Sequence, residues 1–126
     1  LNYSRSEGIV VGRHWELAMK FLCICDYGNV RSVAAARLLK DYGHEAIAIG
    51  IASSHATILG NGWRGFSKES ILDFMLWADV ILNMSSSEQV PYSIRIDVGV
   101  DRWHDSTNQE LLNLLREQLR MFLVEL

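Results

Sequence analysis

Short apolar runs recur along the chain in the way that is typical of buried strands. Three of them, at residues 21–25, 45–50 and 80–84, are rich in Ile, Leu, Val and Ala and lack a regular polar face. Strands that are covered on both faces of a parallel sheet show this pattern. A further strand is predicted at residues 92–96, so the apolar pattern indicates a sheet of four strands.

Three other segments repeat apolar residues with the 3.6-residue period of an amphipathic helix: residues 32–42, 68–78 and 107–123. Gly43 supplies the stop of the first helix. Ser67 is placed to cap the second helix. Thr107, with Glu110 on its C-terminal side, forms a capping box, so Thr107 is the predicted N-cap of the last helix.

The order of these elements predicts the fold class. Strands that alternate with helices pair in parallel, and the crossover helices cover both faces of the sheet. The chain is therefore expected to form a three-layer α/β/α domain around a four-stranded parallel sheet. Ligands of such sheets bind at the carboxyl ends of the strands.

The expected domain covers residues 19–126, and residues 1–18 are interpreted as an N-terminal extension. This extension is either a native arm, with a short strand at residues 8–11, or a remnant of cloning, and Met19 is a candidate native start. Residues 51–65 form a long glycine-containing connection between the second strand and the second helix. Such loops often border functional sites.

Composition narrows the class of protein. Hydrophobic residues make up 49% and charged residues 21% of the 126 residues, which excludes a disordered chain. The formal net charge of −3 argues against nucleic-acid binding. No apolar run approaches the ~20 residues of a membrane span. With two cysteines, Cys23 and Cys25, interpreted as free thiols, the chain is expected to be a cytoplasmic protein without a membrane partner.

One segment at the end of the first strand carries candidate chemistry. Cys25 is followed after five residues by Arg31 and Ser32, at the start of the first helix. The backbone between them is predicted to curl into a cup for one phosphate group, and Arg31 and Ser32 complete that cup. The predicted phosphate-binding residues of this interval are Asp26, Tyr27, Gly28, Asn29 and Val30.

The residue types in this cup suit nucleophilic catalysis. Gly28 and Asn29 tolerate the positive φ angles of a tight loop. The helix N-terminus and the converging amides favour the thiolate of Cys25, and the Ser32 hydroxyl can donate a hydrogen bond to that sulfur. Arg31 is expected to bind two phosphate oxygens at once. Cys23, by contrast, is predicted to be a core residue.

Over residues 19–126 the chain resembles the low-molecular-weight protein tyrosine phosphatases and their bacterial and phage relatives. Members of that family carry Cys-x-Gly-Asn-x-Cys-Arg-Ser after the first strand, and Gly28-Asn29 and Arg31-Ser32 match this motif. Here Gly-Asn lies one place closer to the arginine, and Val30 replaces the second loop cysteine. Residues 77–84 are also similar to the helix-to-strand segment before the family's third strand.

The resemblance implies a cysteine-dependent phosphomonoester hydrolase that needs no cofactor and no metal. Cys25 would be the nucleophile, Arg31 the phosphate-binding group and Asp101 the general acid, with Asp97 as the rival acid. The family keeps its acid in an Asp-Pro-Tyr loop, and here Asp101 precedes Trp103 by two places without the proline. The implied substrate is a phosphorylated protein or a small aryl phosphate, with inorganic phosphate as product.

Aromatic residues are expected to wall the substrate site: Tyr27, Trp63 and Trp103. For Trp63 a role in covering the sheet is an equal alternative. Two other functions stay open. A phosphate-binding or phosphocysteine carrier module would share the loop without hydrolysis. An arsenate reductase-like enzyme would need further redox cysteines, and none follows Cys25 in the sequence.

Overall fold

The computed structural model describes residues 18–26, 30–50, 68–86, 90–99 and 103–123. Within these ranges the elements are β1 (Lys20–Cys25), α2 (Arg31–Asp41), β2 (Glu45–Gly50), α4 (Lys68–Trp77), β3 (Val80–Asn83), β4 (Ser93–Arg95), α5 (Gln109–Gln118) and the 3₁₀ turn η2 (Arg120–Phe122). The predicted strand at residues 8–11 and the predicted cap Ser67 lie outside the described residues.

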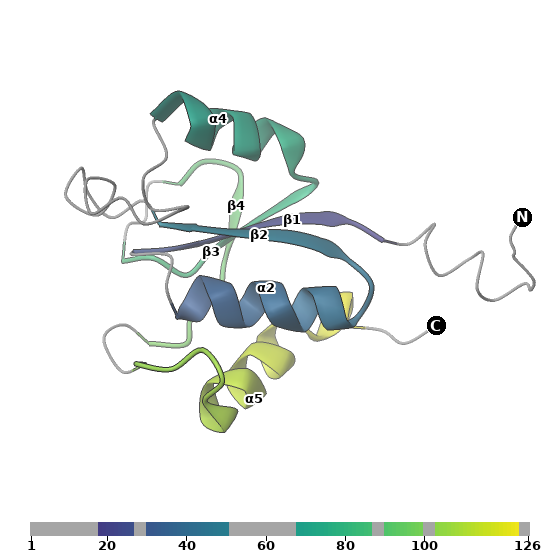
Figure 1. Ribbon diagram of the computed structural model, residues 1–126, viewed down its shortest axis with the longest axis vertical. Coiled ribbons are helices and arrows are strands. Elements are labelled where there is room, and N and C mark those ends of the chain that lie inside the picture. Colours follow the sequence, from purple (N-terminus) through teal and green to yellow (C-terminus); the bar gives the residue numbers. More distant parts are fainter. Residues whose placement is uncertain (1–17, 27–29, 51–67, 87–89, 100–102, 124–126) are drawn as a thin grey trace, which may run out of the picture.

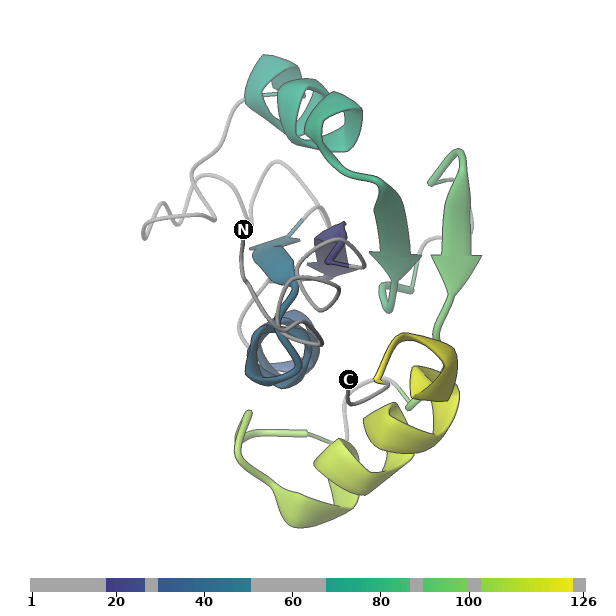
Figure 2. The ribbon, with the colours of Figure 1, turned by 90° about the vertical axis from the view of Figure 1, so that its right-hand side faces the viewer.

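The four strands form one parallel sheet in the order β2-β1-β3-β4. Helix α4 covers one face of this sheet, and α2 and α5 cover the other (Figures 1 and 2). The predicted α/β class, the parallel four-stranded sheet and the three-layer arrangement are therefore confirmed.

Strand β1 contributes to both apolar cores by alternation of its side chains. Phe21, Cys23 and Cys25 belong to the core shared with α2 and α5, whereas Leu22 and Ile24 belong to the core under α4. All five are buried, because β1 is a central strand with a helix layer on each face. The carboxyl end of β1 is thus fixed from both sides.

Helix α2 lies against the sheet through small side chains. Ala34 and Ala35 are fully buried, which lets the helix backbone approach β1 and β2 closely. Helix α2 ends at Asp41 with Tyr42 as its C-cap, and Gly43, the predicted stop, follows with a φ of 94°, the left-handed conformation that glycine adopts without strain.

The start of α5 differs from the prediction by one residue. Asn108, and not Thr107, is the N-cap, because its side-chain oxygen accepts hydrogen bonds from the backbone N–H groups of Glu110 (2.9 Å) and Leu111 (3.1 Å). Thr107 instead donates its N–H and its hydroxyl to the Asp105 carboxylate. The competing turn at Asp105 takes the threonine hydroxyl, so the capping-box assignment to Thr107 was wrong.

The predicted bounds of the fourth strand and of the last helix also shift. Strand β4 begins at Ser93 because Tyr92 adopts a φ of 59°, a left-handed turn conformation that interrupts extended structure. Helix α5 ends at Gln118, and the chain continues as the turn η2 instead of an α-helix to residue 123. The apolar spacing continues through this turn, which is why it resembled one longer helix.

Candidate active site at the carboxyl edge of the sheet

The predicted cysteine lies at the topological switch point of the sheet. The chain crosses from β1 to β2 on one side and then returns to β3 on the other side of β1. The carboxyl ends of β1 and β3, which are neighbours, therefore border the place where ligands of parallel sheets bind. Cys25 ends β1, and Met84, Ser85 and Ser86 follow β3.

Cys25 and Ser32 are brought into direct contact. The Cys25 Sγ atom lies 3.0 Å from the Ser32 Oγ atom, and both residues are buried. Ser32 is in the first turn of α2, which contains no acidic residue. The hydroxyl can therefore donate to a thiolate at this position, at the positive end of the helix dipole.

Arg31 is buried at the same edge and is fixed by two partners. Its Nη2 donates to the Asp26 carboxylate at 3.0 Å, and its Nη1 donates to the Met84 carbonyl. These two bonds hold the guanidinium between the end of β1 and the segment after β3. Arg31 is only 7% exposed, so this orientation is also enforced by packing.

Asp26 pairs with Arg31 and with Ser86. Its second carboxylate oxygen accepts hydrogen bonds from the Ser86 N–H (3.0 Å) and the Ser86 hydroxyl (2.8 Å). Burial alone would raise the pKa of Asp26, but the two bonds from Ser86 and the Arg31 guanidinium outweigh burial and hold the pKa below its ordinary value. Asp26 therefore stays a carboxylate at neutral pH.

A second arginine reaches the segment that follows β3. Arg95, the last residue of β4, donates its Nη1 to the Ser85 carbonyl. The hydroxyl and the N–H of Ser85 in turn donate to the Asn83 side chain, at 2.6 and 2.9 Å. The backbone at residues 84–86 is thus held by hydrogen bonds to the side chains of Arg31, Arg95 and Asp26.

Sequence reasoning missed Ser86 and Arg95. Both signals were present: a polar run follows the third apolar segment, and a charged residue occupies the fourth strand. Because carboxyl ends of parallel strands meet at one edge, these two residues could have been placed near Cys25 once the strand order was known.

Cys23 is a core residue, as its place in the main apolar cluster shows. Burial, and after it the negative charge that the neighbouring Cys25 can carry, raises the pKa of the Cys23 thiol strongly. Cys23 therefore remains a neutral thiol in the folded protein. Both cysteines are buried in this cluster, and Cys25 also contacts Ser32.

Of the remaining predicted residues, Val30 is the N-cap residue of α2 and packs against the main core. The rest fall into two groups. Trp103 packs in the main core, and its indole N–H donates to the Val98 carbonyl at 2.7 Å, so little of its ring is open for stacking. Asp97, the rival acid, is exposed, and its backbone exchanges hydrogen bonds with the Gln118 side chain. The others lie outside the described residues: Tyr27, Gly28, Asn29, Trp63 and Asp101.

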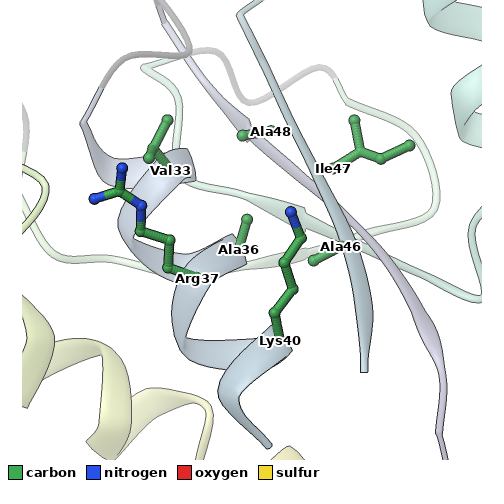
Figure 3. Close-up of a pocket in the computed structure, with 7 residues that line it drawn as sticks. All are labelled: Val33, Ala36, Arg37, Lys40, Ala46, Ile47 and Ala48. Atoms are coloured by element: carbon green, nitrogen blue, oxygen red, sulfur yellow. The ribbon is translucent and has the colours of Figure 1, made fainter. Parts of the chain in front are cut away.

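A pocket of about 320 Å³ lies away from Cys25, between α2 and β2 (Figure 3). Alanine and isoleucine side chains form its floor, and Arg37 and Lys40 stand at its rim. Its lining contains no Cys, Ser, Thr, His, Asp or Glu side chain.

Among the residues that the structure describes, no group of three or more His, Cys, Asp or Glu residues is placed to hold a metal ion. None of the described helices is long and apolar enough to cross a membrane.

Comparisons of the chain with protein-family models, with curated proteins and with solved structures find no match. The likeness to the low-molecular-weight phosphatases therefore rests on the loop motif and on residues 77–84 of this sequence.

Proposed function

We propose that this protein is a cysteine-dependent phosphomonoester hydrolase. The observation that carries the proposal is the 3.0 Å contact between Cys25 Sγ and Ser32 Oγ, at the carboxyl end of β1 and the first turn of α2. A thiol at a helix N-terminus with a hydroxyl donor beside it is a thiol prepared to act as a nucleophile. Arg31, one residue before Ser32, supplies the positive charge that a phosphoryl group needs.

The proposed reaction has two steps. In the first, the Cys25 thiolate attacks phosphorus, a sulfur–phosphorus bond forms, and the bond to the leaving oxygen breaks as Asp101 gives that oxygen a proton. In the second, Asp101 takes a proton from water, the water oxygen bonds to phosphorus, and the electron pair of the sulfur–phosphorus bond returns to sulfur. The Ser32 hydroxyl stabilises the departing thiolate.

The resemblance to the low-molecular-weight protein tyrosine phosphatases supports a narrower proposal for the substrate. An aryl phosphate, either phosphotyrosine in a protein or a small phenolic ester, fits that family. Inorganic phosphate would be the product.

Hydrolysis of a chromogenic aryl phosphate tests this function. Cys25→Ser keeps the size of the side chain and removes the thiolate, so turnover should fall to background while the fold is retained. Cys23→Ala is the matched control, because it removes the other buried thiol from the same strand and should leave measurable turnover in the folded protein. Full activity in the Cys25→Ser variant would refute the cysteine mechanism.

A second function is favoured by one observation. Asp26 already neutralises Arg31, which lowers the net positive charge that the site offers to a phosphate dianion. A phosphate-binding module without turnover is consistent with that balance. Binding of inorganic phosphate by a wild type that hydrolyses no aryl phosphate would support this second function.

A further inference from the structure

Asp26 is a charged residue beside the candidate nucleophile that the proposed chemistry does not use. It is only 6% exposed, and its carboxylate accepts three hydrogen bonds, from the Ser86 N–H, the Ser86 hydroxyl and Arg31. A buried negative charge next to a thiolate and a phosphate would oppose both unless it is compensated. The compensation comes from Arg31, the group that is proposed to bind phosphate.

We propose that Asp26 is a positioning residue: anchored by Ser86, it holds the Arg31 guanidinium in the orientation that receives the phosphoryl group. This inference rests on the proposed phosphate chemistry of the site.

The two anchors of Arg31 come from one side of the site. Nη1 is held by the Met84 carbonyl and Nη2 by Asp26, which is itself bonded to Ser86 in the same segment after β3. A guanidinium has five N–H donors, and these two bonds define its plane. Bidentate binding of phosphate needs that plane to be set, and an arginine that is ordered before binding loses less rotamer freedom when the ligand arrives.

The anchoring of Asp26 favours positioning over competition. In the competing interpretation, the carboxylate occupies the phosphate position and leaves when phosphate binds. Two of its three donors belong to Ser86, however, and both meet the oxygen that does not contact Arg31. The Asp26 carboxylate is therefore held by Ser86, in the segment after β3, whether or not Arg31 binds phosphate.

Asp26→Asn is the informative substitution. Its amide oxygen can still accept from Ser86, but its NH₂ group then faces the Arg31 donors and cannot bond to them. Titration calorimetry with inorganic phosphate should show a dissociation constant raised by about tenfold or more, because the charge-assisted bond that orients Arg31 is lost. The value of kcat/KM for the aryl phosphate, per folded molecule, should fall with it.

Asp105→Asn is the matched control. Asp105 accepts the N–H and the hydroxyl of Thr107 at 2.9 and 2.7 Å, as Asp26 accepts those of Ser86, but Asp105 is exposed in the turn before α5, whereas Arg31 is buried. This variant should bind phosphate as the wild type does. Ser86→Ala, which loses one of the two bonds to Asp26, should weaken phosphate binding less than Asp26→Asn does. Ser86→Thr, which keeps the hydroxyl, should bind more tightly than Ser86→Ala.

Several outcomes would overturn the inference. Unchanged or tighter phosphate binding by folded Asp26→Asn would refute positioning, and tighter binding would identify Asp26 as a competitor. If Arg31→Lys left phosphate binding unchanged, there would be no guanidinium to position. If Asp26→Asn fails to give a folded circular-dichroism spectrum, the phosphate affinities of the two Ser86 variants decide. Tighter binding by Ser86→Thr than by Ser86→Ala supports positioning, and equal or weaker binding by Ser86→Thr refutes it. A wild type that binds phosphate through Arg31 without hydrolysing esters would refute the hydrolase and leave positioning intact.

Discussion

Among single residues, Asp26 and Arg31 are the ones whose charges depend on each other. They are 6% and 7% exposed, and their side chains meet at 3.0 Å. Removing one member of a buried ion pair leaves the other as a charge that is neither solvated nor paired, which is more costly than replacing both. The pair therefore links stability to the electrostatics of the candidate site.

This link predicts a pH dependence of stability. The pKa of Asp26 is held below its usual value of 3.8 in the folded protein, so the carboxylate stabilises the fold above the pKa of the unfolded chain. That contribution is lost as the pH falls through the folded value, below 3.8. In urea unfolding, Asp26→Asn should be about 1–3 kcal/mol less stable than the wild type at pH 7, and the difference should shrink on acidification below about pH 4. A difference that stays constant from pH 7 to pH 3 would contradict this linkage.

At the scale of elements, the apolar pattern predicts the type and order of the helices and strands well. Strand β2 has its predicted ends, because polar residues and glycines border its apolar run. Errors occur where a local turn competes with the pattern, as the left-handed Tyr92 does at the start of β4 and Asp105 does before α5. Such competition depends on which hydrogen bond forms, and periodicity does not report that.

The candidate site likewise contains residues that the local sequence pattern groups and residues that only the strand pairing brings together. Cys25, Arg31 and Ser32 lie close together in sequence, so the strand–loop–helix pattern was sufficient to group them. Ser86 and Arg95 reach the same edge only through the pairing of β1 with β3 and of β3 with β4. That pairing is set by the three-dimensional packing of the sheet, and sequence spacing does not encode it.

The corrected start of α5 gives a prediction for that element. Asn108→Ala removes the side chain that accepts from Glu110 and Leu111, and should lower the free energy of unfolding by about 1 kcal/mol. Thr107→Ala should cost less, since Thr107 bonds to Asp105 in an exposed turn and does not cap the helix. Denaturant unfolding of both variants measures the order. A larger loss for Thr107→Ala would restore the capping box that the sequence suggested.

At the scale of the whole molecule, one histidine ties the start of the sheet to the C-terminal turn. His44 Nδ1 accepts the Met19 N–H at 3.0 Å, and its Nε2–H donates to the Phe122 carbonyl at 2.7 Å. These partners require the neutral tautomer with the proton on Nε2. Phe21 packs edge-on against both the His44 ring and the Phe122 ring, at centroid distances of 5.0 and 4.9 Å.

His44 therefore joins these two segments at the end of the sheet opposite the candidate active site. Its effects on stability and on phosphate binding are expected to be separate. His44→Ala removes the hydrogen-bond partner of the Met19 N–H and of the Phe122 carbonyl, and it removes the ring contact with Phe21. It should therefore lower the free energy of unfolding by about 1–3 kcal/mol. His104 is exposed, so the free energy of unfolding of His104→Ala should stay within about 0.5 kcal/mol of the wild-type value. Because His44 immediately precedes β2 and Cys25 ends the parallel strand β1, the two residues lie at opposite ends of the sheet, and the phosphate affinity of folded His44→Ala should match that of the wild type. A loss of phosphate binding without a loss of stability would show that the two ends of the sheet are coupled in a way that these contacts do not explain.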